Sequence, residues 1–442
     1  MLSSNLINYG LLFITSAIIF RNVDKSDYGL YVILLSLFAL AELFMGGYNQ
    51  AIARFIKEKI PLKDKQQIIL YTFYYKYLVL AVFLILSFIF VKYDLLEFLI
   101  NDFASVSNVV SNFFYIVIVN SIVSIFVGIS TTTLTSLFKY RFVNNLEILR
   151  NITYLVIVLN LVFYTNDYMI YLCVNTSLNI LILVILSYKM YREFNEYTIF
   201  SLLKLKLDIS IYSRYLLSYA TPLTMVSIIT YVKNHLPIII LGKEFELENV
   251  AVFAIMKNFF KAMHSLIGSF VNSLTSKFIT FKENEKKFKL VMNSLYYSNL
   301  IIRTLIYIVL IMTIKYFFMI YKLDNMYINH LIFYILGFEF IIAGIMDNYG
   351  IVLNLGKSTK NLLYIGIIKM TFELVLIYYL LFDYGVLAAA LIVLLSRYFT
   401  VFISYFFIRK NEIFKLSFII IMILLPIVFY FLAEVSVSLK HI

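Results

Sequence analysis

The chain has 442 residues, of which 62% are hydrophobic and only 14% are charged, and its formal net charge is +12. A soluble domain is about half apolar and about a quarter charged, so this composition excludes soluble enzymes, disordered regulators and disulfide-stapled domains. The mean hydropathy is +0.90, and apolar stretches of about the 20 residues that a membrane-spanning helix needs recur along the whole sequence. The sequence therefore predicts a polytopic, all-α membrane protein.

Thirteen apolar stretches alternate with charged breaks along the chain. Each is predicted to be a transmembrane helix, because its length matches the thickness of a bilayer. The predicted spans are roughly 2–20, 29–50, 68–91, 112–137, 151–166, 168–188, 212–232, 250–273, 294–314, 331–354, 361–382, 385–408 and 416–433. We expect the first stretch to be a retained span rather than a signal peptide, because it has no basic leader and no small-residue cleavage site.

Lysine and arginine residues are concentrated in alternate loops of this pattern. The loops after the second, fourth, sixth, eighth, tenth and twelfth spans hold most of them, and Arg150 is assigned to the loop after the fourth span. The positive-inside rule places such loops in the cytoplasm, so the N-terminus is predicted to be cytoplasmic. No predicted loop is long enough for a folded domain of its own. This disfavours polysaccharide polymerases, which usually carry a large outside loop.

The sequence indicates an internal duplication. Asp167–Tyr168, between the fifth and sixth spans, matches Asp383–Tyr384, between the eleventh and twelfth, and each pair precedes an apolar span that ends in a basic cluster. The second and eighth spans also align, with Gly46 on Gly268. Two six-helix bundles of the same orientation form a parallel repeat, and a ligand site is then expected between them near the middle of the membrane. The alternative is a chance alignment of aromatic-rich apolar helices.

Few ionised side chains fall within the predicted spans. Each of them is a candidate functional residue, because a charge at the centre of a bilayer costs at least ~2.5 kcal/mol. They are Lys76, Lys257, Lys261, Arg303, Lys369, Arg397, Glu42, Glu339, Asp347 and Glu373. For Lys76, Arg303 and Lys369, snorkelling or pairing explains the position as well as function does. Lys369 and Glu373 are four residues apart, so they are placed to neutralise each other on one helix.

The eighth span carries a polar stripe. Lys257, Lys261, His264 and Asn272 recur at helical spacing, so they lie on one face of an otherwise apolar helix. Two lysines without an acid in the same span predict a cationic wall that binds an anion. The alternative is an internal ion pair, for example between Glu42 of the second span and Lys261.

Several motifs resemble one known family. They are Asp27-Tyr-Gly-Leu-Tyr31 and Gly46-Gly-Tyr-Asn-Gln-Ala-Ile-Ala-Arg-Phe-Ile-Lys57 at the second span, Tyr219-Ala-Thr-Pro-Leu223 at the seventh, and Asp383-Tyr-Gly-Val-Leu-Ala-Ala-Ala390 before the twelfth. Their order and spacing over residues 1–410 resemble the Wzx-type polysaccharide-biosynthesis flippases of the multidrug/oligosaccharidyl-lipid/polysaccharide exporter superfamily. The chain departs from the family pattern at His235-Leu-Pro237, where that family often has an Asp-Arg pair, and in the additional stretch 416–433.

This resemblance implies a flippase and not an enzyme. Its cargo would be an undecaprenyl-pyrophosphate-linked oligosaccharide, an O-antigen or capsule repeat unit, carried across the bacterial inner membrane by alternating access. We expect the pyrophosphate to dock on Lys257 and Lys261, with Arg54 or Arg397 assisting. The predicted substrate-binding residues are Lys257, Lys261, His264, Arg397, Arg54, Glu42 and Asn272.

Three carboxylates are candidate coupling sites for H⁺ or Na⁺, because a partly desolvated carboxylate can exchange protons as access alternates. They are Glu339, Asp347 and Glu373. The alternative is that they serve as counter-ions of membrane-embedded cations such as Lys257, Lys261 or Arg397. No cofactor and no metal site are expected, because the single cysteine, Cys173, has no partner and the four histidines lack metal-ligand spacing.

The predicted domain organisation is an N-terminal six-helix bundle (1–192), a cytoplasmic linker (193–211), a C-terminal six-helix bundle (212–410) and an extra hydrophobic segment with a tail (411–442). The expected partners are lipid-linked oligosaccharide, membrane lipids, a coupling ion and other polysaccharide-assembly proteins, and no nucleic acid. Two rival functions stay open at this point. One is a cation-coupled multidrug exporter of the same superfamily, and the other, less favoured, is a polysaccharide polymerase.

Overall fold

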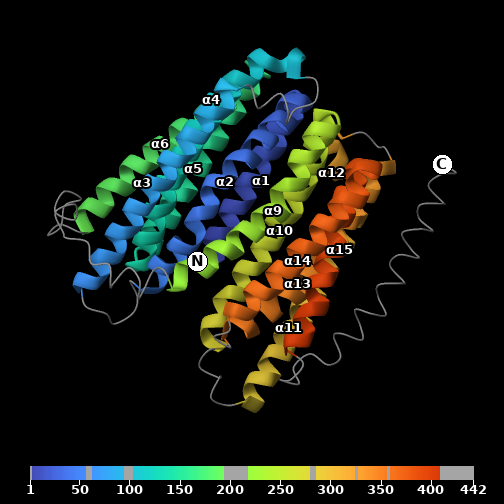
Figure 1. Ribbon diagram of the computed structural model, residues 1–442. Helices are drawn as coiled ribbons and strands as arrows, with labels where there is room; N and C mark the ends of the chain where they lie inside the picture. Colours follow the sequence, from blue (N-terminus) through green and yellow to red (C-terminus); the bar gives the residue numbers. More distant parts are fainter. Residues whose placement is uncertain are drawn as a thin grey trace. The chain divides into compact units, whose positions relative to one another are not determined.

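The computed structural model describes residues 2–55, 62–93, 103–193, 218–278, 285–323, 327–355 and 359–408. All secondary structure in these ranges is helical (Figure 1). The first helices are α1 (Leu2–Asn22), α2 (Lys25–Phe55), α3 (Leu62–Lys92), α4 (Phe103–Ser136), α5 (Tyr140–Leu161) and α6 (Tyr168–Glu193). They are followed by α9 (Ser218–Glu244), α10 (Leu247–Phe278), α11 (Glu285–Met312), α12 (Ile314–Ile320), α13 (Tyr327–Leu355), α14 (Thr359–Leu376), the π-helical turn η3 (Ile377–Leu381) and α15 (Phe382–Ile408).

The prediction of an all-α membrane protein is confirmed. Within the described ranges, eight helical stretches are long and apolar enough to cross a membrane, and the longest, Leu363–Tyr405, contains parts of both α14 and α15. The short helix α12 has no counterpart among the predicted spans, since it lies between the expected ninth and tenth. The thirteenth predicted span, 416–433, lies outside the described residues.

The contacts divide the chain into two compact units, Ser3–Ala251 and Val252–Ile442. In the first unit, helices α1–α6 lie alongside one another (Figure 1), and α9 packs along α2. The predicted linker, 193–211, falls almost entirely outside the described residues. The division into two six-helix bundles therefore stays a prediction.

Close approach between helices of the first unit depends on glycine. A Cβ atom added at Gly29 of α2 would lie 2.1 Å from the carbonyl oxygen of Leu247, the first residue of α10. One added at Gly242 of α9 would lie 2.2 Å from Cδ1 of Ile33 on α2. Both distances are far shorter than van der Waals contact. The packing of α2 against α9 and against the start of α10 therefore depends on the absence of a side chain at these two positions.

The N-termini of α2 and α6 lie side by side. Asp24 and Asp167 each accept a hydrogen bond of 2.8 Å from the second N–H of the helix that follows, and so cap it. The rings of Tyr28 and Tyr168 are in edge contact, with centroids 5.6 Å apart. Burial raises the pKa of the Asp27 carboxyl, and the nearby carboxylates of Asp24 and Asp167 raise it further. The two loops are therefore on the same side of the unit, as the predicted alternation of loops requires.

In the second unit, α14 and α15 form an antiparallel hairpin. The rings of Phe372 and Phe399 stack with centroids 4.0 Å apart, although the residues are far apart in the sequence. The chain reverses at Gly385, which has φ 55° and ψ −129°. This reversal directly follows the Asp383–Tyr384 pair from which the sequence predicts a hairpin.

Gly385→Ala is expected to destabilise this hairpin. A residue with a side chain rarely adopts a positive φ with this ψ, and holding it there costs of order 1–3 kcal/mol. Thermal unfolding of the purified protein in detergent should show a lower midpoint for this variant. If Gly385→Ala unfolds at the same temperature as the unaltered protein, the reversal does not depend on glycine.

Candidate functional site

Helix α10 has two unlike faces. One face packs into the second unit through Phe253 and Phe260, which are 0% and 3% exposed. Asn258 and Lys261 are exposed on the other side of the helix, and Lys257, which is half-buried, lies at the border between the two faces, four residues after Phe253. No large apolar side chain of the described part of α10 is exposed. The accessible face of this apolar helix is therefore polar and cationic.

Other helices expose large apolar side chains instead. On α11, Leu305 and Val309 are each 57% exposed, and on α6 Val184 is 63% exposed. Such apolar faces suit contact with lipid, whereas a charged side chain within a span normally faces protein or water. The polar face of α10 thus has the character of a surface that borders an aqueous space.

Lys261 is available to bind a ligand. Its ammonium group makes no hydrogen bond or ion pair with any residue in the described part of the chain. One helical turn earlier, Lys257 places its Nζ 5.6 Å from the ring centroid of Phe253. Two of the predicted anion-binding residues therefore share one accessible helix face.

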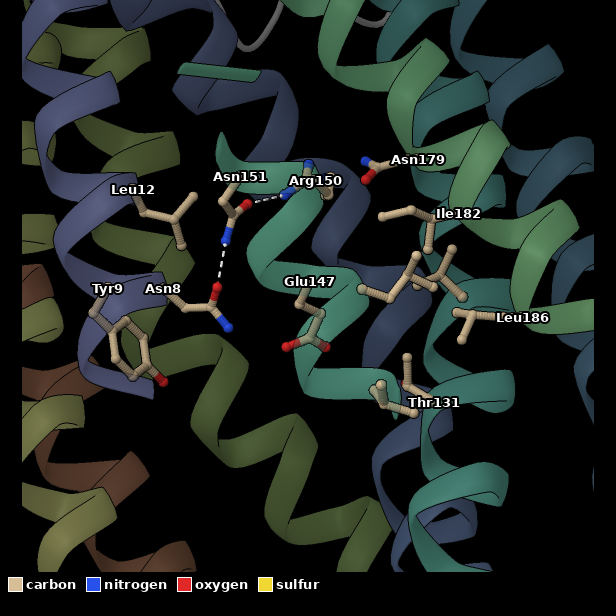
Figure 2. Close-up of a pocket in the computed structure, with 13 residues that line it drawn as sticks. Asn8, Tyr9, Leu12, Thr131, Glu147, Arg150, Asn151, Asn179, Ile182 and Leu186 are labelled. Atoms are coloured by element: carbon tan, nitrogen blue, oxygen red, sulfur yellow. Dashed lines mark hydrogen bonds between the residues drawn. The ribbon is translucent and has the colours of Figure 1, made fainter. Parts of the chain in front are cut away.

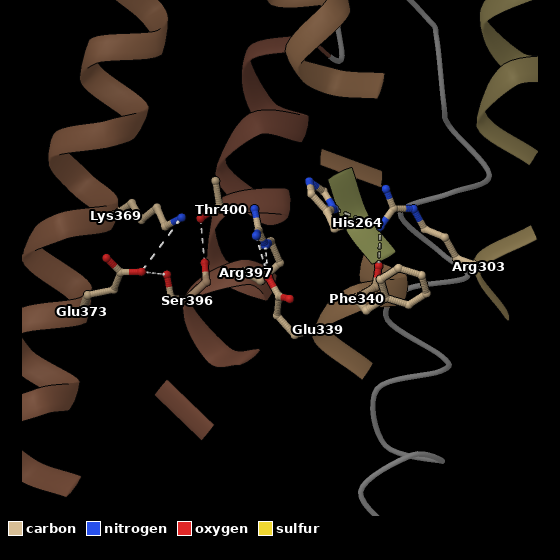
Figure 3. A network of polar contacts seen from close by, with 9 residues as sticks. All are labelled: His264, Arg303, Glu339, Phe340, Lys369, Glu373, Ser396, Arg397 and Thr400. Carbon is tan, nitrogen blue, oxygen red and sulfur yellow. Dashed lines mark hydrogen bonds and ion pairs between the residues drawn. The ribbon is translucent and has the colours of Figure 1, made fainter. Parts of the chain in front are cut away.

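His264, predicted to be part of the same stripe, contacts a buried arginine. Nη1 of Arg303 lies 3.0 Å from Nδ1 of His264 and donates a 2.8 Å hydrogen bond to the carbonyl oxygen of Phe340 (Figure 3). Nε of Arg303 donates to Oδ1 of Asn299 at 2.9 Å. Because a guanidinium only donates hydrogen bonds, Nδ1 of His264 is the acceptor and carries no proton. His264 thus joins α10 to α11 and α13.

Two glycines of α13 receive the large side chains of α11. A Cβ atom at Gly344 would lie 2.6 Å from Cδ of Arg303, and one at Gly337 would lie 2.0 Å from the ring of Tyr307. Arg303 is 0% exposed, so it does not snorkel to a membrane interface. It is a fully buried part of a three-helix contact.

Two ion pairs of predicted site residues lie in the second unit (Figure 3). Arg397 of α15 binds Glu339 of α13, with N–O distances of 2.5 and 2.6 Å. Lys369 lies 3.9 Å from Glu373 on the same helix, and Ser396 of α15 donates a hydrogen bond to the same carboxylate. This geometry fits the counter-ion alternative for Glu339 and Glu373. Their role in ion coupling stays a prediction.

Four predicted site residues have side chains outside the described part of the structure. Helices α2, α10 and α13 include the backbone at these positions. They are Glu42, Arg54, Asn272 and Asp347.

A polar cavity of about 270 Å³ lies within the first unit, between α1, α4, α5 and α6 (Figure 2). Arg150 of α5 donates hydrogen bonds to Oδ1 of Asn151, at 2.9 Å, and to Oδ1 of Asn175. Asn151 in turn donates to Asn8 of α1 at 3.1 Å. The lining residues are Asn8, Tyr9, Leu12, Val127, Thr131, Val143, Leu146, Glu147, Arg150, Asn151, Asn179, Ile182 and Leu186.

The sequence and the fold were compared with those of known proteins. A family model described as "Polysaccharide biosynthesis protein" matches residues 1–275, which is more than half of the chain. The chain belongs to this family. A search of curated proteins by sequence found no match.

The fold of this polysaccharide biosynthesis protein is that of known membrane transporters. A structure titled "Lipid II flippase MurJ, inward closed conformation" matches with a TM-score of 0.72 and 13% identity, over 99% of this chain and 98% of that one. An inward-facing multidrug resistance MATE family transporter of the MOP superfamily matches with a TM-score of 0.66 and 10% identity, over 91% and 94%. A mutant of the Vibrio cholerae MATE transporter VcmN gives 0.59 and 12%, over 93% and 95%. The family resemblance stated from the motifs is confirmed.

Sequence reasoning missed the polar cavity of this family member. The assignment of Arg150 to a cytoplasmic loop is wrong, because this residue lies in the middle of α5 within a stretch apolar enough to span a membrane. The run from Asn144 to Asn151 contains enough polar residues to look like a loop, but several of these residues face one another and the cavity. A helical-period test across the predicted loop would have given a signal for them.

For Lys76 the sequence leaves snorkelling and pairing open, and the structure distinguishes between them. This residue is 1% exposed, and its Nζ donates a 3.0 Å hydrogen bond to Oδ1 of Asn49 on α2. The neighbouring rings of Tyr48 and Tyr75 stack with centroids 3.7 Å apart. Lys76 therefore joins α3 to α2 inside the first unit and does not snorkel.

Proposed function

We propose that this protein is a flippase for an undecaprenyl-pyrophosphate-linked oligosaccharide, an O-antigen or capsule repeat unit, in the bacterial inner membrane with its N-terminus in the cytoplasm. The family match and the flippase-like fold support translocation of a lipid-linked glycan. The observation that carries the proposal is the polar, accessible face of α10, with Lys261 exposed and without an ionic partner among the described residues.

A pyrophosphate headgroup can leave water only if its charges are compensated, since an unpaired buried anion is prohibitive. Lys257 and Lys261 lie one turn apart and supply two ammonium groups on one face. We propose that they bind the pyrophosphate with Arg54 or Arg397 assisting, and that the lipid tail stays in the bilayer. An inside-negative potential favours outward movement of the anion by about 2.3 kcal/mol per charge per 100 mV.

Lys261→Ala is expected to reduce the export of lipid-linked glycan about tenfold to a hundredfold, because a hydrogen bond to a charged group contributes about 1.5–3 kcal/mol. The measurement is the amount of surface polysaccharide in a strain that lacks the native gene and carries each variant. Lys261→Arg, which keeps the charge, should retain most of the activity.

The matched control is Lys315→Ala. Lys315 is an exposed lysine of the same unit, on α12 rather than on α10, and its loss should leave export unchanged. If Lys261→Ala strains assemble polysaccharide normally, the α10 face does not bind the cargo.

A multidrug exporter is the second candidate, because two of the matching folds are MATE transporters and one of these is titled a multidrug resistance transporter. A deletion strain separates the two functions. The flippase proposal requires lipid-linked glycan to accumulate in the inner membrane of that strain, with drug sensitivity unchanged. Greater drug sensitivity without such accumulation would favour the exporter.

A further inference from the structure

The cavity of the first unit contains hydrogen-bonding groups that have no hydrogen-bond partner among the described residues. The carboxylate of Glu147 makes no hydrogen bond or ion pair with any described residue, and Figure 2 shows it directed into the space beside Asn8. Nε of Arg150, one turn further along α5, is buried without an acceptor among the described residues. The guanidinium of Arg150 lies near the half-buried carboxylate of Glu147 and interacts with it electrostatically, but no described residue donates a hydrogen bond to it, so its oxygens can accept from water or a ligand.

The amides of the cavity also have spare capacity. Oδ1 of Asn8 accepts the hydrogen bond from Asn151, and no described residue accepts a hydrogen bond from Nδ2 of Asn8, which is therefore a candidate donor to a ligand. Nδ2 of Asn179 donates to Asn120 at 3.0 Å, and Oδ1 of Asn179 accepts no hydrogen bond from the described residues, so it is a candidate acceptor. The cavity therefore presents both donors and acceptors.

The opposite charges of Glu147 and Arg150 disfavour a simple ion as the ligand of the cavity. A bare cation near Glu147 would also meet the guanidinium of Arg150, and a bare anion near Arg150 would meet the carboxylate, so each would be repelled by one of the two groups. A polyhydroxylated ring suits both, because every hydroxyl group donates and accepts. Apolar lining from Leu12, Val127 and Ile182 suits the carbon skeleton of such a ring.

We propose that this cavity is a subsite for one sugar ring of the transported glycan. Glu147 and Asn179 accept hydrogen bonds from hydroxyl groups, and Asn8 donates to a ring or hydroxyl oxygen. The cavity volume is about 270 Å³. Pockets for drug-sized ligands start at about 300 Å³, so this cavity suits one sugar ring and not a whole oligosaccharide. The proposal rests on the proposed function and deepens it, because the α10 face would select the phosphate and this cavity the sugar.

A fluorescent reporter makes the test direct. The chain contains no tryptophan, so Tyr9→Trp places a unique fluorophore in the cavity wall. The probe is the oligosaccharide released by mild acid from the lipid-linked glycan of the deletion strain, which carries neither phosphate nor lipid. The full-length reporter protein in detergent should show a saturable change in emission with this probe. Leu12→Trp is the second reporter if Tyr9→Trp does not fold.

Glu147→Gln in the reporter background should weaken probe binding about tenfold or more, because a charge-assisted hydrogen bond is lost. Asn179→Leu should weaken it as well. The matched control is Glu248→Gln, which removes an exposed carboxylate of the same unit away from the cavity and should leave binding unchanged.

Three results would overturn the subsite. The first is a reporter that does not respond to the glycan, and the second is a response that Glu147→Gln leaves unaltered. The third is a response to Na⁺ or to pH without glycan that Glu147→Gln abolishes, since the cavity would then be a cation site. If the deletion strain accumulates no lipid-linked glycan, the proposed function fails and the subsite with it. If glycan accumulates and the reporter is silent, only the subsite fails.

Discussion

Arg303→Leu is expected to destabilise the second unit by at least about 3 kcal/mol. The guanidinium is 0% exposed and donates to Asn299, to the carbonyl oxygen of Phe340 and to His264. Its removal leaves three acceptors in or near a buried site, and each unsatisfied buried group costs about 1–3 kcal/mol. The cation–π contact with the ring of Phe340, at 4.9 Å from its centroid, is also lost.

Thermal unfolding in detergent should show this as a fall in the midpoint of about 10 °C. The matched control is Lys286→Leu, which replaces an exposed cation at the start of the same helix and should change the midpoint little. Arg303→Lys should fall between the two, because an ammonium cannot reach all three acceptors at once. If Arg303→Leu and Lys286→Leu unfold at the same temperature, the arginine does not hold the three helices together.

Gly29→Ala is the second substitution with a large expected effect. The new methyl group would lie 2.1 Å from the backbone oxygen of Leu247, which cannot rotate away as a side chain could. Helix α2 and the start of α10 would have to separate, and such overpacking typically costs about 1–3 kcal/mol and occasionally more. We expect lower thermal stability and lower yield of folded protein in the membrane.

Gly128→Ala is the control for this prediction. It is also a glycine within an apolar helix, α4, but a Cβ atom there would meet nothing within 4 Å. Because alanine favours the helix over glycine by about 1 kcal/mol, Gly128→Ala should be neutral or slightly stabilising. A Gly29→Ala protein as stable as the Gly128→Ala protein would mean that α2 and α10 do not approach closely.

Helical periodicity predicted much of the α10 site. Lys257 and Lys261 are neighbours on the helix surface because they are four residues apart, and in the structure Lys261 is exposed whereas Lys257 is half-buried beside Phe253. Periodicity could not predict that His264 contacts Arg303, because that contact joins α10 to α11 and depends on how the two helices pack.

The cavity of the first unit shows a different limit of sequence reasoning. When apolar runs are read between charged breaks, Glu147 and Arg150 count as a break, which is why a loop is predicted before the fifth span begins at Asn151. They belong to α5 because Asn8 of α1 and Asn175 of α6 satisfy hydrogen bonds of Asn151 and Arg150, and those partners are distant in the sequence. A polar segment can lie within a helix bundle when its partners are supplied by other helices.

The amino-acid sequence by itself determined that this is a helical membrane protein, where most of its helices lie and which charges fall within them. Hydrophobic length and helical period are local properties, so they can be read without a fold. The tertiary structure decided which of those charges are neutralised and which remain available. Arg397 meets Glu339 from another helix, whereas Lys261 and Glu147 form no ion pair in the described part of the chain. Ion pairing depends on the distance between side chains in space, and only packed helices set that distance.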